Sequence, residues 1–118
     1  MASNFGNPTA NQVASASVFC PVGSWAALRA GTANIASRQW IMIQPQARAT
    51  IRLALRFVNK NSDGTFTAPT SAAHPDFKIP SDGPLFQLPL GADVTLYGRA
   101  VQNGGTSGGI KVIVSEFS

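Results

Sequence analysis

The amino-acid sequence predicts an all-β protein, a single small β-sandwich or barrel. The main observation is the segment 48–58, Arg-Ala-Thr-Ile-Arg-Leu-Ala-Leu-Arg-Phe-Val, in which apolar and polar residues alternate. Successive side chains of a strand point to opposite sides, so this pattern is typical of a half-buried strand. Turn-forming residues are frequent as well, with 11 Gly and 8 Pro, and no segment supports a long helix.

The other elements follow from local composition. Strands are predicted at 13–20, 38–44, 48–58, 92–102 and 110–117, with short extended pieces at 65–67, 77–79 and 85–88. The segment 38–44 is rich in β-forming apolar residues, so we expect it to be buried on both faces, with Trp40 in the core. The segment 24–28 fits either a short helical turn or a strand.

Turns separate these strands. The cluster 59–64 contains Asp63-Gly64, a dipeptide that favours a hairpin, and 65–67 would be its return strand. The glycine-rich segment 103–109 predicts a hairpin loop between the last two strands. Gly98, inside a strand, suggests a β-bulge.

Two segments lie outside this regular pattern. Residues 1–12 consist mainly of small polar residues and predict a flexible or partner-bound arm, with Phe5 as its anchor. Residues 69–89 contain five prolines and predict a long irregular loop. The remainder, 13–118, is expected to be a single β domain.

The composition favours an assembled protein. Charged residues make up 12% of the 118 residues, about half the usual share. A surface with so little charge is poorly protected against association, so we expect a homo-oligomer, with a trimer as the working expectation. The sequence shows no signal peptide and no apolar run long enough for a membrane span. We therefore expect a soluble protein made in a cytoplasm, with no membrane partner.

One row of cations is the best candidate for partner binding. Arg48, Arg52 and Arg56 lie four residues apart on one strand face, about 13–14 Å between neighbours, a spacing that suits separate contacts along an acidic surface. Arg99 and Lys111 could join that face if the register permits. Trp25, among small residues, is a candidate for an intersubunit contact. The alternative interpretation of the row is a solvated outer face.

The sequence does not predict an enzyme, a cofactor or a metal site. His74 is the single histidine, and its neighbour Asp76 has no accompanying nucleophile motif. His74 and the single Cys20 cannot supply a usual zinc ligand set, and Cys20 is expected to be buried. Nucleic-acid binding is not favoured, because Thr50 and Ala54, rather than aromatic residues, separate the arginines.

The C-terminal quarter resembles a known class of proteins. Ala92-Asp-Val-Thr-Leu-Tyr-Gly-Arg-Ala100 and Gly109-Ile-Lys-Val-Ile-Val-Ser-Glu-Phe117 resemble the ends of small tailed-phage virion proteins. Those proteins often finish with a Tyr-Gly-Arg element, a glycine hairpin and a Val-x-Val-x-Glu strand. The resemblance implies a non-enzymatic structural virion component, a capsid decoration (cement) protein that binds the major capsid protein as a multimer. It implies no catalytic or ligand-binding residues.

Two alternatives remain open at this stage. One is a tail, head–tail connector or fibre-associated virion protein with the same fold. The other is a carbohydrate-binding β-sandwich module whose site would comprise Trp25, Tyr97 and the loop 69–89.

The arginine row generates the first testable expectation. Arg52→Glu should leave the fold intact but weaken attachment to the assembled partner, because it reverses the charge at the middle of the row. Unchanged co-sedimentation with particles at physiological salt would remove the row from the binding surface.

Overall fold

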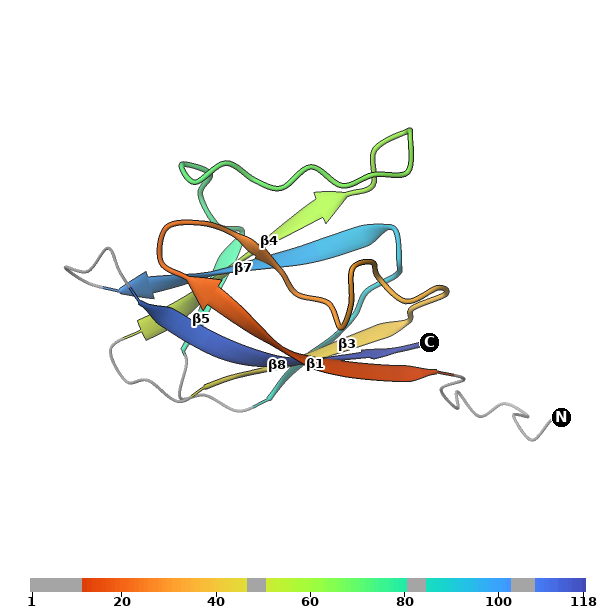
Figure 1. Cartoon of the computed structure of the whole chain (residues 1–118), viewed down its shortest axis with the longest axis horizontal. Coiled ribbons are helices and arrows are strands. Elements are labelled where there is room, and N and C mark those ends of the chain that lie inside the picture. Colours follow the sequence, from red (N-terminus) through yellow and green to blue (C-terminus); the bar gives the residue numbers. More distant parts are fainter. Residues whose placement is uncertain (1–11, 47–50, 81–84, 103–107) are drawn as a thin grey trace, which may run out of the picture.

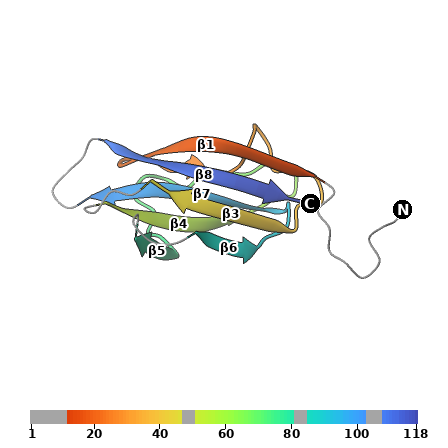
Figure 2. The ribbon, with the colours of Figure 1, turned by 90° about the horizontal axis from the view of Figure 1, so that it is seen from below.

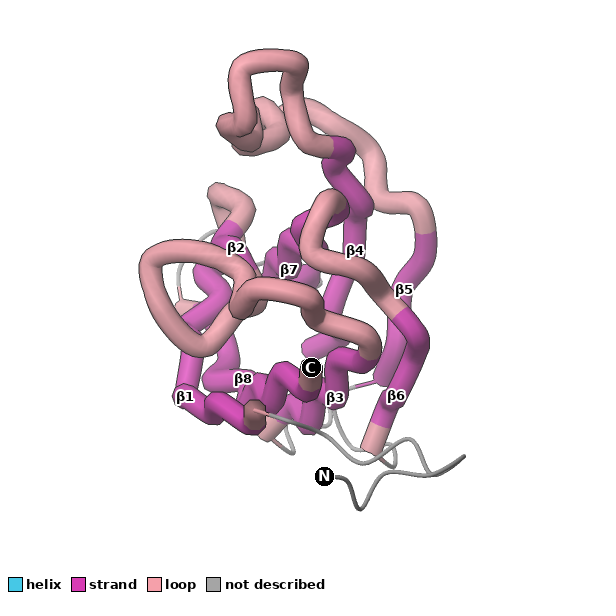
Figure 3. Tube along the Cα trace, turned by 90° about the vertical axis from the view of Figure 1, so that its right-hand side faces the viewer, coloured by secondary structure: helices cyan, strands magenta, loops and turns pink. Residues whose placement is uncertain are grey.

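The computed structural model describes residues 12–46, 51–80, 85–102 and 108–118, and it is an all-β sandwich of two four-stranded sheets. The strands are β1 (Val13–Pro21), β2 (Ala26–Ala27), β3 (Trp40–Pro45), β4 (Ile51–Asn59), β5 (Phe77–Pro80), β6 (Phe86–Pro89), β7 (Val94–Gln102) and β8 (Gly109–Phe117). One sheet has the order β1-β8-β3-β6 and the other β2-β7-β4-β5. Figure 3 shows the two sheets as stacked layers. The predicted fold class is confirmed.

The strand order has a simple logic. The first strand pairs with the last, the second with the second to last, and so on inward. These antiparallel pairs, which together would form one long hairpin, are β1–β8, β2–β7, β3–β6 and β4–β5. That ribbon is folded over, so that β3 also pairs with β8 and β4 with β7. Eight strands wound in this way form a double-sheet jelly roll. Figures 1 and 2 show the two layers from different sides.

The core lies between the sheets and is built from alternate residues of each strand. Ile51, Leu53 and Leu55 of β4 point inward, as the alternation of this segment predicts, and Phe57 packs against the same cluster. Phe57, Phe77 and Phe86 form a chain of aromatic contacts, with ring centroids 5.6 and 5.5 Å apart, that joins the sheets along the β5–β6 side. Cys20 is buried as expected, and this burial raises the pKa of its thiol to about 12.

Three expectations about connections and strand breaks were wrong. The segment 103–109 does not join a hairpin, because β7 and β8 belong to different sheets. The turn at 61–64 forms, with Gly64 at a φ of 89°, but 65–67 is not a strand. Gly98 is not a bulge, because the β4–β7 register runs without a break. A Cβ there would lie 3.1–3.3 Å from three core side chains, so the glycine permits close packing of the sheets.

The prediction for β3 was also wrong. Its residues alternate between buried and more exposed positions, because only one side of its sheet faces the core. Ile41 and Ile43 are fully buried, whereas Trp40 points away from the core and is 39% exposed. A run of uniformly apolar residues therefore marks a strand with an apolar outer side rather than a strand covered on both sides.

A fully buried ion pair closes one end of the sandwich. Arg38 Nη1 lies 2.7 Å from Glu116 Oε2, and neither side chain is exposed. Glu116, on β8, also accepts hydrogen bonds from the backbone N–H groups of Ala30 and Ile35 in the β2–β3 connection. Arg38 donates to the carbonyl oxygens of Leu90, Gly91 and Val94, at the β6–β7 connection. The pair thus fastens two connections to the last strand.

Glu116→Leu should lower the free energy of unfolding by about 3–5 kcal/mol, because it leaves the Arg38 guanidinium buried without a counter-charge and two amides without an acceptor. Glu116→Gln, which keeps one carbonyl oxygen, should cost less. Urea unfolding followed by tryptophan fluorescence measures both.

The control for this experiment is Asp93→Asn, which removes the exposed Lys60–Asp93 pair. It should change stability by less than about 1 kcal/mol. Equal losses for Glu116→Leu and Asp93→Asn would show that the buried pair does not hold the fold together.

Candidate interaction surfaces

The outer sides of the two sheets differ sharply in chemistry. The outer side of the β1-β8-β3-β6 sheet carries most of the exposed large hydrophobic residues and is called the apolar face here. Of the five exposed large hydrophobic residues among the described residues, four lie on this face and the fifth, Leu85, directly precedes β6. The four are Val13 and Phe19 of β1, Trp40 of β3 and Ile113 of β8.

The register spreads these apolar side chains along the sheet, with the hydrogen-bonded pair Ser15–Ser115 between the two ends. Val13, Phe117 and Trp40 are cross-strand neighbours at one end, and Ile113 lies between Ser17 and Gln44 near the middle. Among the outward-pointing residues of these four strands, Lys111 is the single charged one. Exposed large apolar side chains with so little charge around them are typical of a protein-binding surface.

The outer side of the β2-β7-β4-β5 sheet is a cationic face. Arg52 and Arg56 of β4 point outward, and Arg99 of β7 is the cross-strand partner of Ala54 between them. Lys78 of β5 is paired with Ala54 from the other side. The outward residues of these four strands carry these four cations and no acid. Lys111 does not join them, because it lies on the other sheet.

The β4–β5 connection, residues 60–76, passes over this cationic face and uses part of it (Figure 1). Arg99 Nη1 donates to the carbonyl oxygen of Ser71, and Arg56 Nη1 donates to that of His74 at 2.7 Å. The indole Nε1 of Trp25 donates to the carbonyl oxygen of Thr70 at 3.1 Å. The side chains of Trp25, Arg56 and Arg99 thus hold the loop through hydrogen bonds to its backbone carbonyl groups.

Trp25 is the centre of a small second core beneath that loop. Its ring packs with Ala54 and Tyr97, and the Arg99 guanidinium lies 4.6 Å from the ring centroid. Trp25 is 8% exposed and Tyr97 is 5% exposed. Little of either ring is therefore left for a partner or for stacking on a sugar.

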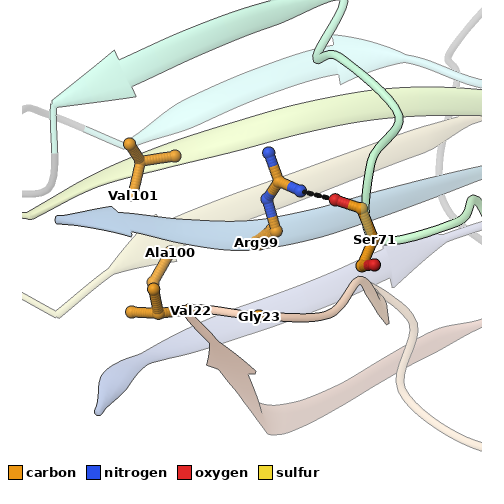
Figure 4. Close-up of a pocket in the computed structure, with 6 residues that line it drawn as sticks. All are labelled: Val22, Gly23, Ser71, Arg99, Ala100 and Val101. Atoms are coloured by element: carbon orange, nitrogen blue, oxygen red, sulfur yellow. Dashed lines mark hydrogen bonds between the residues drawn. The ribbon is translucent and has the colours of Figure 1, made fainter. Parts of the chain in front are cut away.

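A shallow, open depression lies beside Arg99. Its lining residues are Val22, Gly23, Ser71, Arg99, Ala100 and Val101, as Figure 4 shows. The one charged lining group, Arg99, is directed at Ser71, where the figure marks the hydrogen bond. The depression is therefore the boundary between the loop and the sheet, and its one charged group is used to hold the loop rather than to bind a ligand.

The side chains of His74 and Asp76 each contact a backbone group. Asp76 Oδ2 accepts a hydrogen bond from the backbone N–H of Phe57, and His74 Nδ1 lies 3.2 Å from the carbonyl oxygen of Pro75. Both residues belong to the attachment of the loop to β4. Among the described residues, no three His, Cys, Asp or Glu side chains gather as they would around a metal ion.

The sequence-predicted contact residues are distributed as follows. Phe5 and Arg48 lie outside the described residues. Arg52 is exposed on the cationic face, whereas Arg56 and Arg99 also hold the loop. The sequence analysis missed the apolar face, because Val13 and Phe19 share their side of the strand with Ser15 and Ser17 and so do not form a uniform apolar pattern.

The contacts of Arg99 generate a testable expectation. Arg99→Met keeps an unbranched apolar side chain but removes the guanidinium, so it should lower the free energy of unfolding by about 1–2 kcal/mol and loosen the loop. Faster hydrogen exchange confined to the loop and the neighbouring strand ends would be the readout. Arg52→Met, on the same face, is the matched control and should leave the loop protected; equal loosening in both variants would contradict the anchoring role.

No helix in the described part of the chain is long and apolar enough to cross a membrane. Comparison with protein-family models, with curated proteins and with solved structures found no match to this chain.

Proposed function

We propose that this protein is a non-enzymatic structural component of a virion, a decoration subunit that attaches to an assembled capsid surface through its apolar face. The observation that carries the proposal is the separation of the two outer faces, one apolar and one cationic. The jelly-roll winding supports it, since this architecture is used repeatedly in viral shells. The same architecture also occurs in lectins and cupins, so the argument rests on the surfaces.

The apolar face would be the main contact. Val13 and Trp40 lie at one end of this face, Ile113 near its middle and Phe19 beyond it, with serines and Gln44 between them. Burial of such side chains contributes to association in proportion to the apolar area removed from water. Several subunits bound to one shell would strengthen one another through multivalency.

The cationic face would make a weaker, salt-dependent contribution. Arg52 is exposed there, and Lys78 is exposed on the adjacent strand. Charges at the rim of an interface mainly steer association and are screened by salt. The arginine row therefore keeps a part in the proposal, although the apolar face takes the larger one.

The carbohydrate-binding alternative finds no support in the side-chain arrangement. Its expected rings, Trp25 and Tyr97, are buried beneath the β4–β5 connection. A tail or connector role would use the same faces and differ in symmetry.

The test is co-sedimentation with shells of the virus that encodes the chain, stripped of this protein. Ile113→Lys should weaken attachment by at least about tenfold, because it places an unpaired charge in the middle of the apolar face. Arg52→Glu should weaken it a few-fold at low salt, and the effect should fade as salt is raised.

The matched control is Ser62→Lys, which adds the same charge in the exposed 61–64 turn of the β4–β5 connection, outside the apolar face. It should bind normally, and all three variants should unfold like the unmodified protein. Normal attachment of Ile113→Lys would exclude the apolar face as the contact, and loss of attachment only in Arg52→Glu would assign the contact to the cationic face.

A further inference from the structure

The edge of the apolar sheet has an unusual composition. Among the described residues β1 pairs with β8 alone and is an edge strand, and Figure 2 shows it at the margin of the sheet. Edge strands normally carry lysines, prolines or bulges that prevent pairing with other chains. β1 has no lysine and no bulge, its one proline, Pro21, is its last residue, and the chain has no Asp, Glu, Lys, Arg or His before Arg29. The β1–β8 register is continuous from Val13 to Pro21.

The direction of the free backbone groups follows from the hydrogen bonds at both ends of the β1–β8 ladder. Ser118 N donates to Gln12 O, and Val22 N donates to Gly108 O. In an antiparallel pair, alternate residues of a strand bond to the same neighbour. Even-numbered residues of β1 therefore bond to β8, and Val13, Ser15, Ser17 and Phe19 direct their N–H and C=O groups to the open edge.

The inner side of β1 is incompletely covered within one chain. Ala14, Ala16 and Val18 point inward but are only half-buried, whereas the inward residues Val112 and Val114 of β8 are fully buried. The strand across from β1 in the other sheet, β2, is only two residues long. A second chain paired along the edge of β1 would cover the inward side chains of β1 that β2 leaves half-buried.

The sequence of β1 fits a second copy of itself. When two β1 strands run antiparallel about a two-fold axis at Ala16, Val13 lies opposite Phe19, and Ser15 lies opposite Ser17. On the inner side Ala14 lies opposite Val18, and Ala16 meets its own copy. Each position then meets a residue of its own kind, apolar with apolar and serine with serine, as an isologous interface requires.

We infer that this protein forms a two-fold dimer in which the free edges of two β1 strands pair antiparallel, centred on Ala16. The four odd-numbered residues then exchange backbone hydrogen bonds, and the two β1-β8-β3-β6 sheets become one continuous sheet. Val13 of each copy meets Phe19 of the other, so the two apolar faces join into one. The inferred dimer differs from the trimer expected from the sequence, and it is formed through the edge of β1, whatever the apolar face binds.

Paired charge variants test the register. Ser15→Lys/Ser17→Lys places like charges opposite each other across the axis, whereas Ser15→Lys/Ser17→Glu places opposite charges there. Sedimentation velocity over a range of protein concentrations should show a dimer for the unmodified protein and for the Lys/Glu variant, and a monomer for the Lys/Lys variant. Far-UV circular dichroism verifies that both variants are folded.

Cross-linking tests the axis directly. Residues at a non-hydrogen-bonded antiparallel pair have Cα atoms about 4.5 Å apart, within the range that a disulfide spans. Ala16→Cys should therefore give a disulfide-linked dimer on mild oxidation. Ala14→Cys, on the same side of the same strand, is the matched control and should not, because its copy lies about four residues away along the strand. Cys20 gives no background, since it is buried and its pKa is raised to about 12.

A monomer at every accessible concentration, or a dimer that the Lys/Lys variant leaves intact, would overturn the inference. Equal cross-linking of Ala14→Cys and Ala16→Cys would overturn the axis at Ala16. A monomer that still co-sediments with shells would refute the dimer and leave the proposed function standing, and a dimer that does not bind shells would do the reverse.

Discussion

The rest of the structure depends on the contact between Arg38 and Glu116, which holds together one end of the sandwich. Their side chains are separated by 78 positions in the chain, yet they meet 2.7 Å apart with no exposure to solvent. A buried ion pair is tolerated only when further hydrogen bonds satisfy both groups, and here the surrounding N–H and C=O groups do so. The arrangement locks the β2–β3 and β6–β7 connections to β8. Because β8 is the strand that pairs with both β1 and β3, the apolar sheet is positioned by the same contact.

With the sheets fixed in this way, the outer faces acquire distinct roles. The cationic face is partly covered by its own chain, since the β4–β5 connection is held there by Trp25, Arg56 and Arg99. The apolar face has no such cover among the described residues. The two outer sides of the sandwich are therefore unlike: the chain covers part of one and leaves the other exposed. Such an asymmetry suits a protein that lies between a surface and solvent.

The fold class and the inward residues of β4 could be predicted because period-two alternation is a local signal. The two tryptophans could not be placed in the same way. Trp40 was expected inside and lies on the surface, whereas Trp25, a candidate for an intersubunit contact, is nearly buried. Trp25 is covered by a connection more than 30 residues away in the chain, and Trp40 lies on the outer side of the other sheet; local pattern carries no information about either arrangement. The Arg38–Glu116 pair was missed for the same reason: its partners meet only when the ribbon is rolled.

The nested pairing of strands also has a consequence for the order of events during synthesis. β1 is made first among the strands, but its partner β8 is made last, and the charged residues that usually protect an unpaired strand are absent from it. Contacts between such distant segments form slowly, because a large loop must close before they are gained. Until β8 leaves the ribosome, β1 has two open edges rather than one.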